Sequence, residues 1–276
     1  MIPCTVLIPA HDEADYIDAC LDSLLAQDHV GPVQVILIAN GCRDATAKRA
    51  RLRQAEFSRR SWSLKVEELE QGGKTGALNH GDRCADPDSV RVYLDADIRM
   101  SPGLLGGLVQ ALDTPEPRYA GGRLVVSPAR SFVSRNYARF WQKLPFVHRG
   151  VTGAGLFAVN PPGRARWGNF PAIISDDTFA RLQFTEEERI LVDEPYDWPI
   201  AEGFARLVRV RRRQDLGVAE IARDFPELPE RQGHVRPDRS ELMGLAAADP
   251  LGFAIYAAVA LAVRLGRNKQ KWARGR

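Results

Sequence analysis

Three short runs of apolar residues, rich in β-branched side chains, most constrain the fold of this chain. They lie at Cys4–Ile8, Val33–Ala39 and Val90–Leu94, and segments with a helical spacing of apolar residues separate them. Strands that are apolar on both sides are typical of a parallel sheet covered by helices, because both faces of the sheet are then buried. The alternation predicts βαβ units, with a first helix from about Glu13 to Gln27.

The composition is that of an ordinary folded protein. Of the 276 residues, 45% are apolar and 26% are charged, which excludes a collagen, a coiled coil and a largely disordered chain. The length suits one large α/β domain or two small ones. Beyond Gly121, seven prolines between Pro128 and Pro199 divide the chain into short segments. We therefore expect an irregular lobe there, and not a repeat of the first half.

The positive charge of the chain is concentrated at its C-terminus. The formal net charge is +3, and the residues from 264 to 276 contribute +6 without any acid, which leaves −3 for the rest. These basic residues are Arg264, Arg267, Lys269, Lys271, Arg274 and Arg276. A nucleic-acid-binding protein spreads its basic residues over a working face, so we expect no nucleic-acid partner. The tail suits the anionic surface of a membrane instead.

The segment just before this tail, Leu251–Val263, is apolar apart from Gly252. Its 13 residues are fewer than the ~20 that a spanning helix needs, so we expect it not to cross a bilayer. Two interpretations remain open. One is a helix buried in the core, and the other is a helix at a membrane surface with Trp272 and the basic tail among the headgroups.

The cysteines and the N-terminus favour the cytoplasm. The four cysteines form no C-x-x-C pair and the histidines lack metal-site spacing, so neither disulfides nor a zinc site are indicated. The chain begins with a strand-like run and shows no pattern of a secretory signal. We expect a cytoplasmic protein, with the inner face of the cell membrane as the surface available to the tail.

Polar residues follow the predicted strands at the edge where open parallel α/β sheets bind ligands. Asp95 and Asp97 end the third strand, and their two-residue spacing directs both carboxylates to one face. Such a pair suits a hard divalent cation, which would neutralise a diphosphate. The same pattern is also typical of a turn or a helix cap.

Lys74 is a candidate anion-binding residue at the start of a helix. It lies in Gly73-Lys74-Thr75, but Glu68 stands where the P-loop motif requires its first glycine. No G-x-G-x-x-G follows the first strand either, which disfavours a dinucleotide site. The remaining interpretations are a cation delivered to an anion at a helix N-terminus and a solvated surface lysine.

Two further sets of acids and amides stand at predicted element ends. Glu13 and Asn40 are polar residues at neighbouring strand ends, although Asn40-Gly41 is also typical of a turn and Asp44 of a helix N-cap. Asp176 and Asp177 begin a short helical stretch. We expect only one of this pair to face a pocket, where it would accept a proton from an attacking hydroxyl. Capping of the helix is the alternative.

A dense run of arginines lies on a helix predicted at Ala201–Gln214. With 3.6 residues per turn, Arg209, Arg212 and Arg213 share one face. That face suits a diphosphate, a phospholipid surface or plain solvent.

Taken in order, these motifs resemble those of the family 2 glycosyltransferases of GT-A fold. The matching segments are Ile8–Glu13 with Leu21–Gln27, Asn40–Thr46, Gly73–Asn79, Asp95–Asp97 and Ser175–Asp177. The resemblance implies an α/β fold with a Rossmann-like, mostly parallel sheet, helices on both faces, an irregular acceptor lobe and C-terminal helices. It also implies a transferase domain over 1–215, with a nucleotide-binding half at 1–120 and an acceptor-side half at 121–215. A helical extension with the basic tail, 216–276, would follow.

The function that the resemblance implies is inverting transfer of a hexose-type sugar from a nucleotide-diphospho-sugar to an acceptor hydroxyl, with Mg²⁺ or Mn²⁺. The acceptor would be a glycolipid, a polysaccharide precursor or a small molecule. The resemblance also implies roles for single residues. Donor binding would involve the nucleoside with Pro9, Ala10, Glu13 and Asn40, the nucleotide side with Lys74, and the leaving group with Arg209 and Arg212. Asp97 would bind the metal, Asp95 would lie near the ribose or a metal-bound water, and Asp177 would be the general base.

The chain departs from the family pattern at two places. Ala39 stands where members commonly carry an aspartate that helps to read the base, so the identity of the base stays open. The processive Q-x-x-R-W signature is absent from 209–214, which favours addition of a single sugar.

Two other functions were weighed against transfer. A nucleotidyltransferase that forms sugar nucleotides needs a glycine-rich, basic loop after the first strand, whereas this loop is Pro9-Ala-His-Asp-Glu13. A catalytically silent scaffold at a membrane is disfavoured by the intact Asp95, Asp97 and Asp177.

Overall fold

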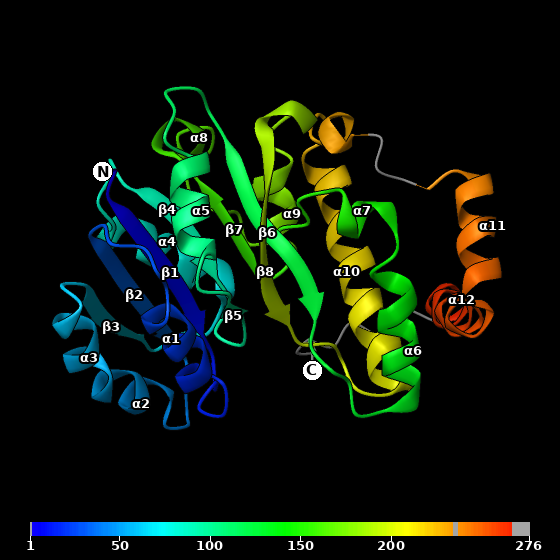
Figure 1. Cartoon of the computed structure of the whole chain (residues 1–276), viewed down its shortest axis with the longest axis horizontal. Helices are drawn as coiled ribbons and strands as arrows, with labels where there is room; N and C mark the ends of the chain where they lie inside the picture. Colours follow the sequence, from blue (N-terminus) through cyan, green and yellow to red (C-terminus); the bar gives the residue numbers. More distant parts are fainter. Residues whose placement is uncertain (1, 234–236, 267–276) are drawn as a thin grey trace.

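The protein is described here by a computed structural model that covers residues 2–233 and 237–266. Its centre is one eight-stranded sheet with the order β3-β2-β1-β4-β7-β6-β8-β5 (Figure 1). The three strands predicted from the apolar runs are confirmed as β1 (Cys4–Ala10), β2 (Val33–Asn40) and β4 (Val90–Leu94). The fold is therefore the α/β class that the sequence predicts.

The sheet is mostly parallel, but two of its strands, β7 and β5, run against their neighbours. The other strands are β3 (Ser63–Leu69), β5 (Arg99–Met100), β6 (Tyr119–Val126), β7 (Leu156–Val159) and β8 (Arg189–Trp198). Strands β3, β2, β1 and β4 are parallel, β7 runs antiparallel to both β4 and β6, β6 is again parallel to β8, and β5 pairs antiparallel with β8. The expected irregular lobe thus contributes three strands to the same sheet.

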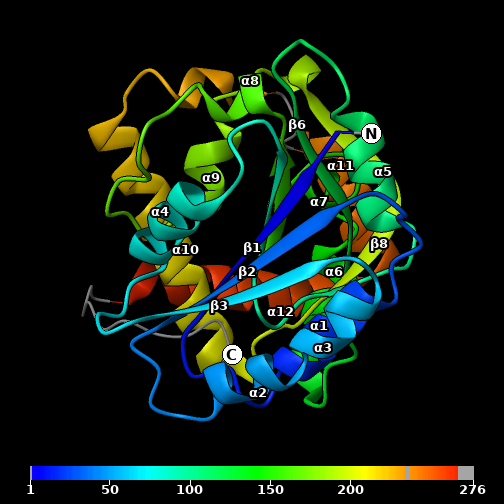
Figure 2. The same ribbon diagram turned by 90° about the vertical axis from the view of Figure 1, so that its left-hand side faces the viewer.

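Both faces of the sheet are buried, and the period of two along a strand decides which side chain faces which core. In β1, Val6 and Ile8 belong to one hydrophobic core and Leu7 to the other. The first core is covered by α1 (Ile17–Leu25), α2 (Thr46–Leu52), α3 (Gln54–Arg59), α5 (Leu104–Ala111), α6 (Phe132–Trp141) and α7 (Pro145–His148). The second is covered by α4 (Lys74–Cys84) and α9 (Asp176–Arg181). Figure 2 shows α1 to α3 on one side of the sheet and α4 on the other.

The first helix is shorter than the sequence predicts. The predicted start was about Glu13, but α1 begins at Ile17. The backbone N–H of Glu13 donates to Thr46 Oγ1 (2.7 Å) and that of Ala14 to Asp44 Oδ2 (3.0 Å). These two bonds tie the loop after β1 to the loop after β2, and the helix begins only beyond them.

The C-terminal part is helical, and one helix crosses the expected boundary at residue 215. The remaining elements are α8 (Pro161–Arg164), the short 3₁₀ helices at Glu186–Glu188 and Pro229–Gln232, α10 (Phe204–Asp224), α11 (Arg239–Ala248) and α12 (Pro250–Leu265). Side chains of α10 enter both cores, through Leu207 on one side and Ile221 on the other. The basic tail from 267 onward, with Trp272, lies outside the described residues.

Candidate active site

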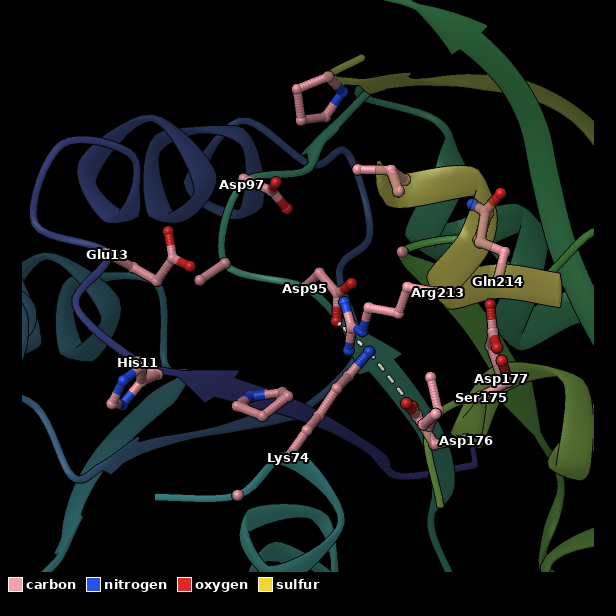
Figure 3. A pocket seen from close by; sticks show the side chains of 18 of the residues that line it. His11, Glu13, Lys74, Asp95, Asp97, Ser175, Asp176, Asp177, Arg213 and Gln214 are labelled. Carbon is pink, nitrogen blue, oxygen red and sulfur yellow. Dashed lines mark ion pairs between the residues drawn. The ribbon is translucent and has the colours of Figure 1, made fainter. Parts of the chain in front are cut away.

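A cavity of about 560 Å³ opens at the carboxyl ends of the parallel strands (Figure 3). Its walls come from the ends of β1, β2, β4 and β8, from the loops before α4 and β7, and from α9 and α10. The lining residues are Pro9, His11, Glu13, Asn40, Gly72, Gly73, Lys74, Asp95, Ala96, Asp97, Ala154, Gly155, Ile174, Ser175, Asp176, Asp177, Trp198, Pro199, Val210, Arg213 and Gln214. The position is the one that open α/β sheets use for ligands.

Most of the residues singled out from the sequence meet in this cavity. Those that line it are Pro9, Glu13, Asn40, Lys74, Asp95, Asp97 and Asp177. Three others do not line it. Ala10 is buried inside β1, Arg209 is exposed on α10, and Arg212 donates from Nη2 to the backbone oxygen of Ala262 (2.7 Å).

Asp95 and Asp97 reach the cavity from a turn after β4. The N–H of Ile98 donates to the carbonyl of Asp95 (3.1 Å), and the N–H of Asp95 donates to the carbonyl of Gly155 (2.8 Å). Gly155 has φ +74°, and a Cβ there would lie 2.6 Å from Cδ1 of Ile98. This close approach fixes the turn against the loop that precedes β7, so the carboxylates of Asp95 and Asp97 stay at the cavity wall.

Lys74 is the first residue of α4, and Gly73 and Asn40 fix its position. Gly73 has φ +145°, a conformation that residues with a Cβ rarely adopt. The N–H of Gly73 donates to Oδ1 of Asn40 (2.9 Å), and Nδ2 of Asn40 donates to the carbonyl of Ala10 (2.9 Å). Asn40 therefore joins the ends of β1 and β2 to the start of α4, and its amide is used in positioning Lys74.

The Lys74 ammonium lies between two carboxylates from different elements. Its Nζ is 2.8 Å from Oδ1 of Asp95 and 3.2 Å from Oδ2 of Asp176 (Figure 3). Burial would lower the pKa of Lys74, but the carboxylates of Asp176, Asp95 and Asp177 outweigh it and raise that pKa. Lys74 is thus a permanent cation that ties the end of β4 to the start of α9.

The two acids of α9 have different surroundings. The side chain of Asp176 is 6% exposed and pairs with Lys74, and burial raises its pKa to about 6, with Asp177 and Asp95 adding to the rise and Lys74 opposing it. Asp177 is half-buried, and its Oδ1 accepts the N–H of Thr178 (2.7 Å). Both acids line the cavity, so the prediction that only one faces a pocket was wrong. The reason is that the first turn of α9 points its end, and not its side, at the cavity.

Arg213, and not Arg209 or Arg212, is the arginine of the run that lines the cavity. The helical spacing placed all three on one face. It could not show that Arg212 is directed to α12 through Ala262 while Arg213 is directed to the cavity. The side chain of Arg213 is labelled in Figure 3, where it points into the cavity.

Other lining residues were missed by the sequence reasoning. His11 belongs to the loop after β1, and its Nδ1 lies 2.6 Å from the carbonyl oxygen of Asn40. Trp198 ends β8 and stacks on Trp141, with 5.4 Å between ring centroids. A polar or aromatic residue at a strand end was the available signal for both, but β8 itself was not predicted.

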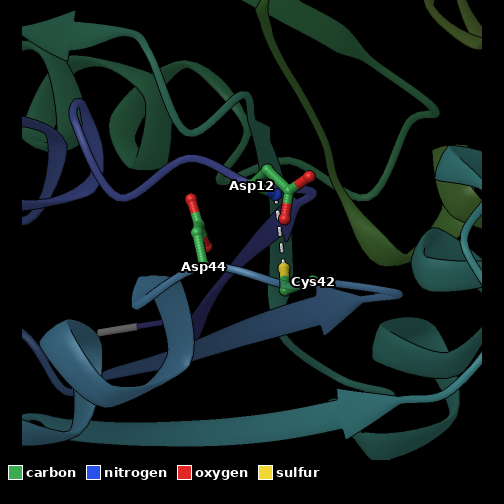
Figure 4. A group of neighbouring side chains, drawn as sticks. All are labelled: Asp12, Cys42 and Asp44. Atoms are coloured by element: carbon green, nitrogen blue, oxygen red, sulfur yellow. Dashed lines mark hydrogen bonds between the residues drawn. The ribbon is translucent and has the colours of Figure 1, made fainter.

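A second group of acids and sulfur, Asp12, Cys42 and Asp44, lies near the cavity loops (Figure 4). Oδ1 of Asp12 accepts the N–H of Arg43 (2.6 Å), and Asp44 accepts the N–H groups of Ala14 and Thr46 (3.0 and 2.9 Å). The Cys42 thiol donates to the carbonyl of Ala10 (3.4 Å). These bonds hold the loops after β1 and β2 together, so the cluster has a structural role.

The chemistry of the cavity favours a divalent cation. Among its lining residues are five carboxylates, from Glu13, Asp95, Asp97, Asp176 and Asp177, and only two permanently charged cations, Lys74 and Arg213. Carboxylate oxygens are the ligands that Mg²⁺ and Mn²⁺ prefer. An anionic diphosphate would be repelled by this surplus of negative charge unless a cation came with it.

The comparison with family models identifies one family. The family model described as Glycosyl transferase family 2 matches residues 5–169, which is more than half of the chain. None of the curated proteins matches the sequence.

Several solved structures share the fold. The mannosyltransferase PcManGT from Pyrobaculum calidifontis, in complex with GDP-Man and Mn²⁺, has a TM-score of 0.58 and 23% identity, with 96% of this chain and 76% of that chain covered. TarS 1–349 from S. aureus has a TM-score of 0.56 and 14% identity, covering 95% and 72%. Glucosyl-3-phosphoglycerate synthase from Mycobacterium tuberculosis, in complex with Mn²⁺, UDP and glucosyl-3-phosphoglycerate, has a TM-score of 0.52 and 20% identity, with 80% of this chain and 78% of that chain covered.

Proposed function

The chain belongs to glycosyl transferase family 2 and is a glycosyltransferase, and from that membership we propose that it moves a single sugar from a nucleotide-diphospho-sugar to an acceptor hydroxyl with inversion at the anomeric carbon. The observation that supports this most is the meeting of Lys74, Asp95, Asp97, Asp177 and Arg213 in one cavity, from four separate segments. The nucleotidyltransferase and the silent scaffold are not retained, because the family is one of glycosyltransferases.

Asp97, with Asp95 beside it, would hold Mg²⁺ or Mn²⁺. The ion would supply positive charge to the diphosphate as that group departs, which is the kind of electrostatic stabilisation that contributes most in such reactions. The structures of PcManGT and of the M. tuberculosis synthase were both determined with Mn²⁺.

Lys74 and Arg213 would bind the diphosphate from the two sides of the cavity that α4 and α10 form. Arg213 would take the role that the family resemblance implied for Arg209 and Arg212. Pro9, Glu13 and the Asn40 end of β2 would lie against the nucleoside. Ala39 leaves the identity of the base open.

Asp177 would act as the general base. The oxygen of the acceptor hydroxyl attacks C1 of the sugar and gives its proton to the carboxylate of Asp177, while the bond from C1 to the diphosphate oxygen breaks on the opposite side and its electron pair leaves with the nucleotide. Within the described part of the chain, Oδ2 of Asp177 carries no hydrogen bond, so it is suited to accept that proton. A single displacement of this kind inverts the anomeric centre.

The test compares Asp177→Asn with Asp193→Asn, whose side chain is 93% exposed and does not line the cavity. A panel of nucleotide-sugars and acceptors is screened for nucleotide diphosphate release with Mn²⁺. We expect Asp177→Asn to keep its affinity for the donor and to lose ~10²-fold or more in kcat, since a general base contributes about that much, while Asp193→Asn stays active. Near-normal kcat in Asp177→Asn would remove the base role from this residue.

A further inference from the structure

One face of α12 is apolar and exposed along the whole helix. Leu251, Leu261 and Leu265 are 46%, 57% and 75% exposed, and Ala254 and Ala258 between them are exposed as well. The spacing of the five is 3, 4, 3 and 4 residues, which on an α-helix keeps them within an arc of about 80°. We call these five residues the apolar stripe.

The stripe is not the face by which α12 joins the protein. The opposite side carries Phe253, which packs on Phe140 of α6 with 5.6 Å between ring centroids, and Tyr256, which packs on Phe140 and Tyr137. Val259 on that side is 1% exposed. A helix on the surface of a globular protein normally places polar residues outward, whereas α12 has only one charged residue, Arg264.

The orientation of α12 is fixed at both ends. Oδ1 of Asp249 accepts the N–H of Gly252 (3.0 Å) at its start, and the Asp249 carboxylate is held by two hydrogen bonds from Arg139 of α6 (2.7 and 2.8 Å). Near its end, Arg212 of α10 donates to the carbonyl of Ala262. The stripe is therefore presented outward by a helix that cannot rotate to bury it, at the edge of the molecule far from β3 (Figure 1).

The charge that follows the stripe identifies the kind of surface that would cover it. Arg264 and the five basic residues after it, with no acid between 264 and 276, adjoin the stripe in sequence. Exposed leucines next to a basic cluster match a lipid bilayer with anionic headgroups, since the apolar side chains enter the acyl boundary while the cations meet the headgroups. We propose that α12 lies in the plane of an anionic membrane surface, with the apolar stripe inserted.

The 16 residues of α12 span about 24 Å, which is less than the ~30 Å hydrocarbon core of a bilayer. The helix is thus suited to lie on the membrane. No helix in the described ranges is long and apolar enough to cross one. Binding of this kind does not depend on the transferase activity, and it is tested without a donor or an acceptor.

The experiment measures co-sedimentation of the full chain with two kinds of vesicle. One is phosphatidylcholine alone, and the other is phosphatidylcholine with about 30% phosphatidylserine. The stripe variant carries Leu251→Gln, Leu261→Gln and Leu265→Gln. Its matched control carries Val30→Gln, Leu52→Gln and Val218→Gln, three side chains that are 86%, 72% and 54% exposed elsewhere. A third variant carries Arg264→Gln, Lys269→Gln and Lys271→Gln. Circular dichroism checks that each variant is folded.

We expect the wild type and the matched control to bind the anionic vesicles, and the stripe variant to bind at least ~10-fold more weakly. The charge variant should lose its preference for anionic over neutral vesicles. Wild-type protein that stays in the supernatant, or a stripe variant that binds as the wild type does, would overturn the proposal. Sedimentation velocity at several concentrations provides the other outcome: a dimer that the stripe variant abolishes, with no vesicle binding, would assign the stripe to a second copy of the chain.

Discussion

At the scale of single residues, the candidate site is organised around Lys74. Its ammonium joins Asp95, at the end of β4, to Asp176, at the start of α9. Asp177, the proposed base, follows Asp176 directly, so the cation that we assign to the diphosphate also fixes the base helix. This arrangement means that changes at Lys74 should be felt in stability as well as in donor binding.

The Lys74→Met variant should be destabilised, and more so at pH 8 than at pH 5. The pKa of Asp176 in the folded protein is about 6, above the ~3.9 of an unfolded aspartate. The cost of burying its anion therefore accumulates as the pH rises between these two values and is complete above pH 6. Without Lys74 that pKa rises further. Because the side chains of Lys74 and Asp95 are about one third exposed, we expect Lys74→Met to lower the free energy of unfolding by about 2 kcal/mol at pH 8 and by less at pH 5.

Urea unfolding at the two pH values measures this difference. Lys48→Met serves as the control, since Lys48 is exposed on α2, and it should change stability little at either pH. An equal loss for Lys74→Met at both pH values would show that Asp176 is not the group left uncompensated.

The residues of the site divide into those that a linear pattern can reveal and those that it cannot. Asp95, Asp97 and Lys74 follow strands or open a helix, and strand ends meet at one edge of a parallel sheet, so their convergence was predictable. Arg213 was placed on one face with Arg209 and Arg212, but the site role was assigned to the other two, because a helical wheel gives a face and not the neighbour that the face meets. The link from Lys74 to Asp176 joins residues 102 positions apart, which no local pattern encodes.

At the scale of elements, strands were predicted better than helix ends. β4 has the predicted bounds, and β1 and β2 extend the predicted runs by two residues and by one. α1 starts later than predicted, and the N–H groups of Glu13 and Ala14 before it bind side chains of the loop after β2, contacts across 30 or more residues that no local pattern encodes. The helix predicted at Ala201–Gln214 begins at Phe204 and continues to Asp224, because the Arg run carried no stop signal. The other five strands, β3 and β5 to β8, were not predicted, and in β8 the alternation is interrupted by Pro195.

Asp249 should determine how firmly α12 is attached. It caps α12 and receives Arg139 from α6, and its pKa is lowered by Arg139 first and by the N–H of Gly252. We expect Asp249→Ala to cost about 1–2 kcal/mol through the lost cap, and to speed amide exchange in α12. Asp238→Ala removes the cap of α11, which is exposed and has no arginine partner among the described residues, so its effect should be smaller. Equal effects of the two changes would mean that the pair with Arg139 adds nothing.

At the scale of the whole molecule, the two halves expected from the sequence share one sheet. β4 of the first half pairs with β7 of the second, and β5 of the first pairs with β8 of the second. One core runs from Cys4 in β1 to Val259 in α12. The sequence could not reveal that strands of the two halves pair, because antiparallel pairing between distant strands leaves no periodic signal. The cavity therefore has walls from both halves, and the halves should not unfold separately.

A donor that binds across the cavity should then stabilise the whole chain. At 100 times its Kd, a ligand of the native state adds about 2.7 kcal/mol, which for a chain of this size raises Tm by roughly 5 °C. We expect this rise in Tm for a nucleotide-sugar with Mn²⁺. Circular dichroism and tryptophan fluorescence should give the same rise. The fluorescence covers both halves, since Trp62 lies in the first and Trp141 and Trp198 lie in the second. In Asp97→Ala the part of the rise that requires Mn²⁺ should vanish, while Asp193→Ala should retain it. Separate transitions for the two probes would show that the shared sheet does not couple the halves. A Mn²⁺-dependent rise that persists in Asp97→Ala would remove Asp97 from the metal site.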